Sequence, residues 1–390
     1  MKRLPLAAAI VLATITPAFS ADSNAGLESL RAEIRAQQAR LDAQQKQIEA
    51  LAAQQESAPS AASDTTVGGY GEVHFNHRDG DDPAVGRNNI HAHRVVLMVA
   101  HRFADDLRFF SEVEFEGAPD STGIETEVEQ FGIAWQVQEK LQLTIGQFLV
   151  PVGLLNETHE PETFYGVERN PVEEFVIPAT WWEKGVLASW RATDGLSVEV
   201  ALHNGLLGDV NTLGTADGLR GFRQEFGGAR VEDAAATARV KFTGVNGLEL
   251  GLALQRQENI TQSGDPLTGG KAPAVLAEVH AVYSTGRFTL RALAAQWDID
   301  NAVAAGNGTD ALDGWYVEPS WKANEKVGVF TRYNRWNTAA NVVGVQDEEQ
   351  TNVGMNWWIA PRVVLKVDVQ DSNRAGGLGD GFNLGMGLGF

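Results

Sequence analysis

Cysteine is absent from the 390-residue chain, so disulfide bonds cannot contribute to its stability. Beyond residue 20 the sequence also has no apolar run near the roughly 20 residues that a membrane-spanning helix requires, which excludes a helical membrane protein. Basic residues are few, and the formal net charge of −20 makes nucleic acids and anionic lipid headgroups poor partners for the surface as a whole. The chain must therefore be stabilised by a large core or by a closed hydrogen-bonded wall.

The N-terminus has the organisation of a secretory signal peptide. Two basic residues precede an apolar stretch at 4–15, and a helix breaker, Pro17, is followed by small residues. Cleavage after Ser20 fits the pattern, although cleavage after Ala21 is nearly as good. We therefore exclude residues 1–20 from the fold.

A heptad pattern follows the signal peptide. The two seams are Leu27, Ile34, Leu41 and Ile48, and Leu30, Gln37, Gln44 and Leu51. This spacing predicts a coiled-coil oligomerisation helix at 22–55. Glutamines in the second seam weaken the pattern, so a single solvated helix stays open as an alternative. The stretch at 56–66, rich in Ser, Ala and Thr, is expected to be a linker.

The rest of the chain, 67–390, alternates in hydrophobicity with a period of two, in segments of about ten residues. That is the length with which a tilted strand crosses a bilayer. We predict sixteen such strands. They lie at 67–78, 89–103, 107–116, 126–138, 140–149, 184–192, 196–204, 235–243, 247–258, 274–284, 287–298, 312–323, 326–336, 349–359, 362–370 and 381–390.

The connectors between these segments alternate between short and long. Seven are tight turns with turn-forming residues, such as Thr193-Asp194-Gly195 and Gly244-Val245-Asn246. The eight long ones lie at 79–88, 117–125, 150–183, 205–234, 259–273, 299–311, 337–348 and 371–380. This asymmetry is typical of an outer-membrane barrel with both termini in the periplasm. The predicted coiled coil would then also be periplasmic.

The last segment carries the most specific signal. Its alternate residues Phe382, Leu384, Met386, Leu388 and Phe390 are apolar, while Asn383 and three glycines occupy the other face. A terminal strand that ends on an aromatic residue resembles the C-terminal signature of bacterial outer-membrane proteins, which the barrel-assembly machinery would bind through Phe390. Alternation alone would also fit a soluble two-sheet sandwich, and such a secreted carbohydrate-binding β-protein is our alternative from another class.

Four segments resemble the phosphate-selective porin family of the outer membrane. They are Gly146-Gln147-Phe148-Leu149-Val150-Pro151-Val152-Gly153, Glu168-Arg169-Asn170-Pro171, Glu183-Lys184-Gly185-Val186 and Leu202-His203-Asn204-Gly205. The resemblance implies a trimeric sixteen-stranded barrel, a long loop folded into the lumen and an anion pathway lined by arginines and lysines. The sequence departs from the phosphate-selective members because no Arg-x-Arg-x-Arg run is present.

The longest connector, 150–183, is the candidate constriction of such a channel. It carries Glu157, Glu160, Glu162, Glu168, Glu173, Glu174 and Glu183 against the single Arg169. If these carboxylates face water, the local field favours cations; alternatively, they accept hydrogen bonds that only tether the loop. Strand parity and one loop cluster predict the other lumen residues: Arg94, Arg102, Arg108, Glu112, Glu114, Arg220, Arg223, Arg230, Arg239, Lys241, Arg332 and Lys366.

Aromatic and histidine positions complete the prediction. Trp135, Trp190, Trp297, Trp321 and Trp336, with the pairs 181–182 and 357–358, suit interfacial girdles, although the pair at 181–182 could instead anchor the constriction loop. His91 and His93 share a strand face, near His74 and His77, but they lack a further ligand at metal-binding spacing, so we predict no metal site and no cofactor.

The sequence therefore predicts a passive outer-membrane channel of a Gram-negative bacterium. Known catalytic motifs are absent, which favours a channel over an enzyme. The expected partners are outer-membrane lipid, further copies of the chain in a homotrimer, the barrel-assembly machinery, and small hydrophilic solutes or ions. A preference for anions or for phosphate is the alternative within the same class.

Overall fold

A computed structural model describes residues 64–79, 88–117, 124–214, 218–224, 226–342, 347–373 and 379–390. The predicted signal peptide, the predicted coiled coil at 22–55 and most of the predicted linker lie outside the described residues. The last two residues of that linker, Thr65 and Thr66, belong to the first strand because they already pair with the second.

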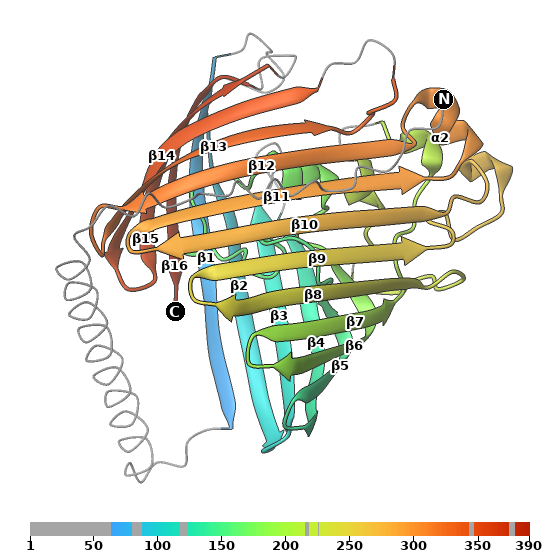
Figure 1. Cartoon of the computed structure of the whole chain (residues 1–390), viewed down its shortest axis with the longest axis horizontal. Coiled ribbons are helices and arrows are strands. Elements are labelled where there is room, and N and C mark those ends of the chain that lie inside the picture. The colour runs from blue at the N-terminus through green and yellow to red at the C-terminus, as the bar shows by residue number, and fades with distance from the viewer. Residues whose placement is uncertain are drawn as a thin grey trace, which may run out of the picture. The chain divides into compact units, whose positions relative to one another are not determined.

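The described chain is built of sixteen strands (Figure 1). They are β1 (Thr65–Arg78), β2 (Asn88–Ala104), β3 (Leu107–Gly117), β4 (Ile124–Gln138), β5 (Leu141–Leu149), β6 (Trp182–Thr193), β7 (Leu196–His203), β8 (Ala235–Val245), β9 (Leu248–Gln257), β10 (Ala274–Thr285), β11 (Phe288–Ile299), β12 (Ala311–Lys322), β13 (Val327–Asn337), β14 (Glu348–Ala360), β15 (Val363–Ser372) and β16 (Gly381–Gly389). Every predicted strand is confirmed.

The strands close into one antiparallel barrel in chain order, with β16 pairing β1. Closure is completed at the chain end, where Phe390 and Gly69 exchange two backbone hydrogen bonds of 2.9 and 3.1 Å. A closed sheet satisfies all its backbone donors and acceptors without a free edge, which is what a hydrocarbon environment demands. The soluble two-sheet alternative is wrong, because one continuous sheet is observed.

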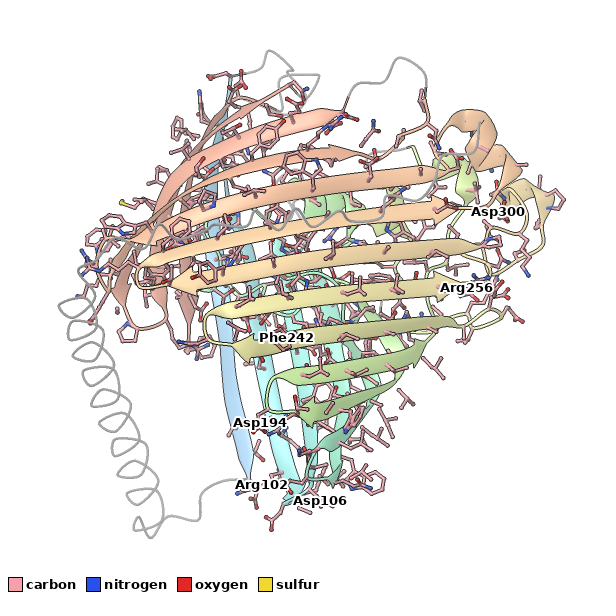
Figure 2. The ribbon with its side chains drawn as sticks, in the orientation of Figure 1. Arg102, Asp106, Asp194, Phe242, Arg256 and Asp300 are labelled. Atoms are coloured by element: carbon pink, nitrogen blue, oxygen red, sulfur yellow. The ribbon has the colours of Figure 1, made fainter. Side chains whose placement is uncertain are left out.

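Seven connectors at one end of the barrel are short, as predicted, and six of them have two residues between the strands. Gly247 and Gly286 adopt positive φ values of 75° and 58° in two of these turns, a conformation that favours glycine. Figure 2 shows Asp106 and Asp194, both in short turns, at the end opposite Arg256 and Asp300, which adjoin long connectors.

The two faces of the wall differ as the alternation predicts. In β9, Leu250, Leu252 and Leu254 are exposed on the outside, whereas Ala253 and Gln255 are buried within the barrel. The outer surface carries the same kind of residue on other strands: Val95, Leu97, Phe115, Phe131, Ile145, Val186, Val200, Val240, Val329, Val353, Val369, Leu384 and Met386. An apolar outer band around a polar interior is the arrangement of a membrane barrel. Among the described residues, no helix is both long and apolar enough to cross a membrane.

Two of the register irregularities are β-bulges that lie away from the short turns and interrupt the alternation on the inner face. Glu72 pairs with Arg94 and Val73 with Ala92, so His93 is an extra residue in β2. In the same way Glu112 pairs with Gln130 and Val113 with Val128, which makes Glu129 the extra residue in β4. A bulge re-aims one side chain relative to the regular pleat, and here each adds a polar group to the interior.

The interior of the barrel contains an apolar core where the long connectors fold inward. The one-turn helix η1 (Val172–Val176) packs against β11, β12 and β13. The apolar core of the barrel interior includes Val172, Val176, Ile177, Trp181, Leu206, Leu219, Phe222, Trp297, Tyr316 and Trp336. The girdle prediction is therefore wrong for Trp297 and Trp336, whose strand parity points them inward, while Trp135, Trp190, Trp321 and Trp357 are exposed on the outside.

Candidate functional site: a loop folded against the barrel wall

The connector 150–181 leaves β5 and returns to β6 as a compact loop, which we call the constriction loop. Its two ends are joined by the hydrogen bond from the Val150 N–H to the Trp181 carbonyl, 2.8 Å. The buried amide of Asn156 bridges them, because it donates to both carbonyls and accepts from the Trp181 N–H at 2.6 Å. Asn156 thus holds the two ends of the loop together. Trp181 anchors the loop and is not part of an interfacial aromatic girdle.

Glu173 holds the interior of the loop and is fully buried. Its carboxylate accepts the backbone N–H groups of Leu154 and Leu155 at 2.8 and 2.6 Å, and the hydroxyl of Tyr316 on β12 at 2.8 Å. Gly153 adopts a φ of 77°, and a Cβ there would lie 2.8 Å from the carboxylate. These contacts attach the loop to the wall. They also mean that the carboxylate of Glu173 interacts with protein groups and does not face the water of the lumen.

Two further glutamates, one on the loop and one directly after it, also have partners. Glu168 accepts from Asn76 at 2.8 Å and pairs with His74 at 3.1 Å, both on β1. Glu183, at the start of β6, accepts from the indole of Trp181 at 2.9 Å and from Asn204. These two glutamates bind the loop to the wall instead of lining a water-filled path.

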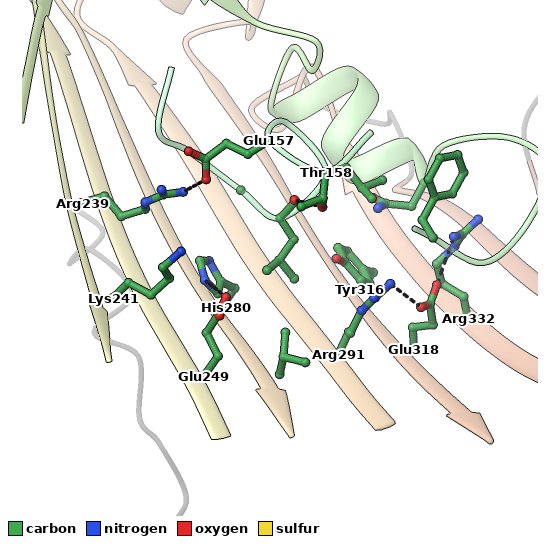
Figure 3. A pocket seen from close by; sticks show the side chains of 16 residues that line it. Glu157, Thr158, Arg239, Lys241, Glu249, His280, Arg291, Tyr316, Glu318 and Arg332 are labelled. Carbon is green, nitrogen blue, oxygen red and sulfur yellow. Dashed lines mark hydrogen bonds and ion pairs between the residues drawn. The ribbon is translucent and has the colours of Figure 1, made fainter. Parts of the chain in front are cut away.

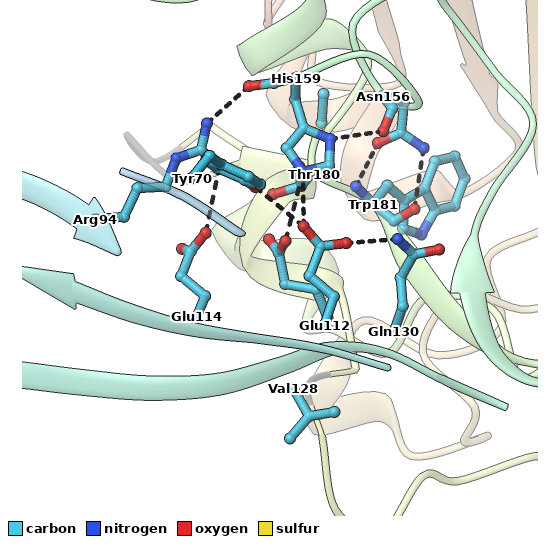
Figure 4. A network of polar contacts seen from close by, with 12 residues as sticks. Tyr70, Arg94, Glu112, Glu114, Val128, Gln130, Asn156, His159, Thr180 and Trp181 are labelled. Atoms are coloured by element: carbon cyan, nitrogen blue, oxygen red, sulfur yellow. Dashed lines mark hydrogen bonds and ion pairs between the residues drawn. The ribbon is translucent and has the colours of Figure 1, made fainter. Parts of the chain in front are cut away.

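The loop contacts the β1–β4 wall through a buried polar network centred on His159 (Figure 4). The imidazole donates through Nδ1 to the Asn156 carbonyl at 3.1 Å, while Nε2 lies 3.6 Å from Glu112 and 3.5 Å from Glu129. Burial would lower the pKa of His159, but the two carboxylates outweigh it and raise the pKa to about 9. Without another cation present, His159 is a charged tether at neutral pH.

Arg94 completes this network and has an exposed fraction of 1%. Its guanidinium pairs with Glu72 at 2.6 Å and with Glu114 at 3.2 Å, and it donates to the carbonyl of His159 at 2.8 Å. The predicted lumen residues Arg94, Glu112 and Glu114 thus do lie on the inner face, but beneath the loop.

A second long connector, 204–234, makes hydrogen bonds to the end of the constriction loop. The guanidiniums of Arg220 and Arg223 donate to the carbonyls of Ala179 and Thr180 respectively, and Arg223 lies over the ring of Trp182. Arg169 also reaches the Ala179 carbonyl, at 3.4 Å. The cluster predicted near residue 220 therefore holds the loop, whereas Arg230 is exposed farther along the connector.

A cavity of about 260 Å³ separates the loop from the β8–β13 wall (Figure 3). Arg239 bridges Glu157 on the loop, at 2.5 Å, and Glu199 on β7. Further along, Arg332 pairs with Glu318 at 3.1 Å. The charged groups that line the cavity are Glu157, Arg239, Lys241, Glu249, Arg291, Glu318 and Arg332, together with His280. Four of these are permanent cations and three are carboxylates.

The remaining predicted residues lie elsewhere. Arg102 and Arg108 are exposed at the short-turn end, where Arg102 pairs with Asp64. Glu162 pairs with Arg362 at that end, and Lys366 lies 3.6 Å from the ring centre of Phe164. Glu160 and Glu174 are half-buried on the loop.

Several residues of the site were not predicted. Glu249, His280, Arg291, Tyr316 and Glu318 line the cavity, and all of them share the inward parity of their strands. Extending the parity rule to every strand would have found them. Glu129 and His159 could not be found in that way, because one lies on a bulge and the other on the loop.

The histidines near the first long connector form a cluster that the sequence only suggested. Ring nitrogens of His74, His91 and His93 lie within 4.8 Å of one another. His74 is already paired with Glu72 and Glu168 at 3.1 Å each, so it is engaged as an ion-pair partner. His77 contacts Asn88 and Asp79 instead.

Solved structures share this architecture. An anion-selective porin from Comamonas acidovorans matches with a TM-score of 0.56 and 12% identity, over 83% of this chain and 98% of that one. The outer-membrane channel DcaP of Acinetobacter baumannii gives 0.55 and 12%, over 85% and 99%, and OmpT of Vibrio cholerae without loop L8 gives 0.54 and 12%, over 84% and 99%. At such identities the likeness shows the fold.

A barrel of this architecture, with a loop folded into its interior, defines an outer-membrane channel protein. The family model of the phosphate-selective porins O and P matches residues 66–375, and the chain belongs to that family. A curated relative, an uncharacterized protein of Aquifex aeolicus (strain VF5), is 33% identical over 189 residues, which are 48% of this chain and 42% of the relative. The chain is thus a porin of the outer membrane. The part that aligns with the Aquifex protein spans less than half of that relative's length.

Proposed function

We propose that this porin is a passive diffusion channel with a moderate preference for small anions, narrowed by the constriction loop. The proposal rests on the distribution of charge around the cavity. Loop carboxylates are largely taken up by tethers, as for Glu173 and Glu168. Lys241 and Arg291 line the cavity and are only half-buried, and Arg291 shares Glu318, at 3.5 Å, with Arg332. A local excess of positive charge in a narrow aqueous passage favours anions.

The moderate strength of the preference follows from the carboxylates that share the cavity. Glu157 and Glu318 neutralise Arg239 and Arg332, and Glu249 lies near Lys241 (Figure 3). A mixed lining of this kind attracts anions less than an uninterrupted series of arginines would. We therefore propose small anions and anionic solutes in general, rather than phosphate in particular, as the solutes that pass.

Reversal potentials in planar bilayers under a KCl gradient test the proposal. Wild-type channels are expected to favour chloride, and the double substitution Lys241→Gln, Arg291→Gln is expected to reduce or abolish that preference. Arg102→Gln is the matched control, because Arg102 is an exposed cation at the short-turn end and does not line the cavity. Cation preference in the wild type, or an equal shift in the control, would refute the proposal.

We also propose how the channel is exported, assembled and oligomerised. A cleaved signal peptide would deliver the chain to the periplasm, and Phe390 would be read there by the barrel-assembly machinery. The segment 22–55 would form a periplasmic coiled coil that supports a homotrimer within outer-membrane lipid. The channel would have no catalytic activity. Chemical cross-linking of the purified protein with and without residues 22–55 tests the contribution of that segment to the trimer.

A further inference from the structure

The buried cluster of Glu112, Glu129 and His159 has the composition and spacing of a metal site. Its three ligand atoms lie within 4.8 Å of one another, and the three residues have exposed fractions of 1%, 0% and 2%. Imidazole and carboxylate groups are ligands of divalent transition metals such as Zn²⁺. We propose that this cluster binds one such ion, which fastens the constriction loop to the β3–β4 wall.

Unpartnered atoms in the cluster point to a missing ligand. Both carboxylate oxygens of Glu129 are buried and accept no hydrogen bond from the described residues. The Nε2 atom of His159 is likewise without a hydrogen bond and faces both carboxylates. Buried polar atoms normally have hydrogen-bond partners, so three atoms without one in a single cluster support a bound ion.

The distances fit an ion better than direct hydrogen bonds. Nε2 lies 3.6 Å from Glu112 Oε1 and 3.5 Å from Glu129 Oε2, beyond the usual length of a charge-assisted hydrogen bond. Zinc bonds to nitrogen and oxygen of about 2.0–2.2 Å, arranged tetrahedrally, separate neighbouring ligand atoms by about 3.3–3.6 Å. The two distances from the imidazole nitrogen therefore match the separation that such an ion imposes, and all three ligand atoms lie within 4.8 Å of one another.

The surroundings orient the ligands as the outer shell of a metal site does. His159 donates through Nδ1 to the Asn156 carbonyl, which leaves the Nε2 lone pair directed at the carboxylates. Glu112 accepts from the Tyr70 hydroxyl at 3.1 Å and from the Gln130 amide at 2.5 Å. Each of these contacts fixes the orientation of one ligand.

Charge balance favours the same ion. Arg94 is paired with Glu72 and Glu114, so His159 is the ion-pair partner of Glu112 and Glu129 among the described residues. With a proton on Nε2 the three groups carry one uncompensated negative charge in a buried site, which is costly. A divalent ion in place of that proton would bring the cluster to neutrality.

The bulge in β4 supplies the second carboxylate. Glu129 is the extra residue opposite the Glu112–Val113 step, and the bulge turns it inward together with Gln130. A regular strand would place only one of these two neighbours on the inner face. The local distortion of the sheet thus completes the set of ligands.

Metal analysis of the full mature protein tests the proposal. The protein, purified in detergent, is stripped with EDTA, incubated with Zn²⁺, washed with a weak chelator and assayed for bound zinc. Wild type is expected to retain one Zn²⁺ per chain, and Glu129→Gln is expected to lose at least about 100-fold in affinity, since even loss of an outer-shell partner costs about 10–100-fold. Glu125→Gln, an exposed carboxylate of β4 outside the network, is expected to bind normally.

Two further variants keep the test decisive. His159→Gln lies on the loop rather than in a strand, so it replaces Glu129→Gln if that variant fails to show heat-modifiable migration, and it too is expected to lose zinc. His91→Ala with His93→Ala removes the separate histidine cluster and is expected to keep the ion. The proposal is overturned if wild type binds no stoichiometric zinc, if Glu129→Gln and His159→Gln still bind it, or if only the His91 and His93 variant loses it.

Discussion

The hydroxyl of Tyr316 on β12 donates a 2.8 Å hydrogen bond to the carboxylate of Glu173, which lies 143 residues earlier in the chain. The same carboxylate satisfies two backbone N–H groups of the constriction loop. One buried acid therefore joins the loop to itself and to the barrel wall. We therefore expect the width of the passage to depend on this contact.

Replacing Glu173 by Gln is expected to loosen the loop. The amide can accept fewer of the four hydrogen bonds that the carboxylate receives, from Leu154, Leu155, Asn170 and Tyr316, and each buried donor left without a partner costs about 1–3 kcal/mol. Single-channel recordings should show larger and more variable conductance. Tyr316→Phe, which removes one bond, should have a smaller effect, and Glu160→Gln on the same loop should have almost none. Unchanged conductance in a folded Glu173→Gln channel would contradict this role.

Removing the two guanidiniums of Arg220 and Arg223 is expected to enlarge the sieving size of the channel. Both donate to loop carbonyls at 179–180, so the double substitution to Gln frees the loop on that side. Liposome-swelling rates for sugars of increasing size provide the measurement, and the larger sugars should gain most. Arg230→Gln, an exposed residue of the same connector, is the control. Equal swelling in all three proteins would speak against a gripping role.

Substitutions on the outer and inner faces of the same strand, β9, are expected to have different effects. Leu252 on β9 is 50% exposed on the outer face, whereas Glu249 lines the cavity. Leu252→Arg is expected to destabilise the inserted barrel by about 2–4 kcal/mol, because it places a charge against hydrocarbon. Glu249→Arg should insert normally and increase anion preference. Urea-dependent folding into vesicles measures the first effect, and a reversal of the two outcomes would mean that the faces are misassigned.

The barrel could be predicted from sequence because its rule is local. Period-two alternation and the regular spacing of turns located all sixteen strands with errors of at most two residues. The same rule, applied to Trp297 and Trp336, would have directed both indoles inward, where Trp297 donates to the Val176 carbonyl at 2.9 Å. Their placement in a girdle followed residue type instead of parity, and it was wrong.

The partners of the loop could not be predicted from sequence. Glu173 and Tyr316, or His159 and Glu112, meet only through the closed fold, and nothing in their sequence spacing indicates it. Bulges add a second difficulty, because one extra residue reverses parity on one side of it, as at Glu129. The residue types of a constriction are thus visible in the sequence, while their pairing is decided by tertiary structure.

The ion pair of Glu157 with Arg239 provides a test of whether the charge of the cavity lining, rather than the attachment of the loop, sets the ion selectivity. Glu157 is the loop carboxylate that neutralises Arg239 at the cavity, where their charged atoms lie 2.5 Å apart. Glu157→Gln leaves Arg239 held by Glu199 but raises the net charge of the lining by one unit. Anion preference, measured as the reversal potential in a KCl gradient, is therefore expected to increase. Glu162→Gln, which removes a loop carboxylate at the short-turn end beside Arg362, should leave the reversal potential unchanged. If the two variants shift it equally, the cavity charges do not set the selectivity.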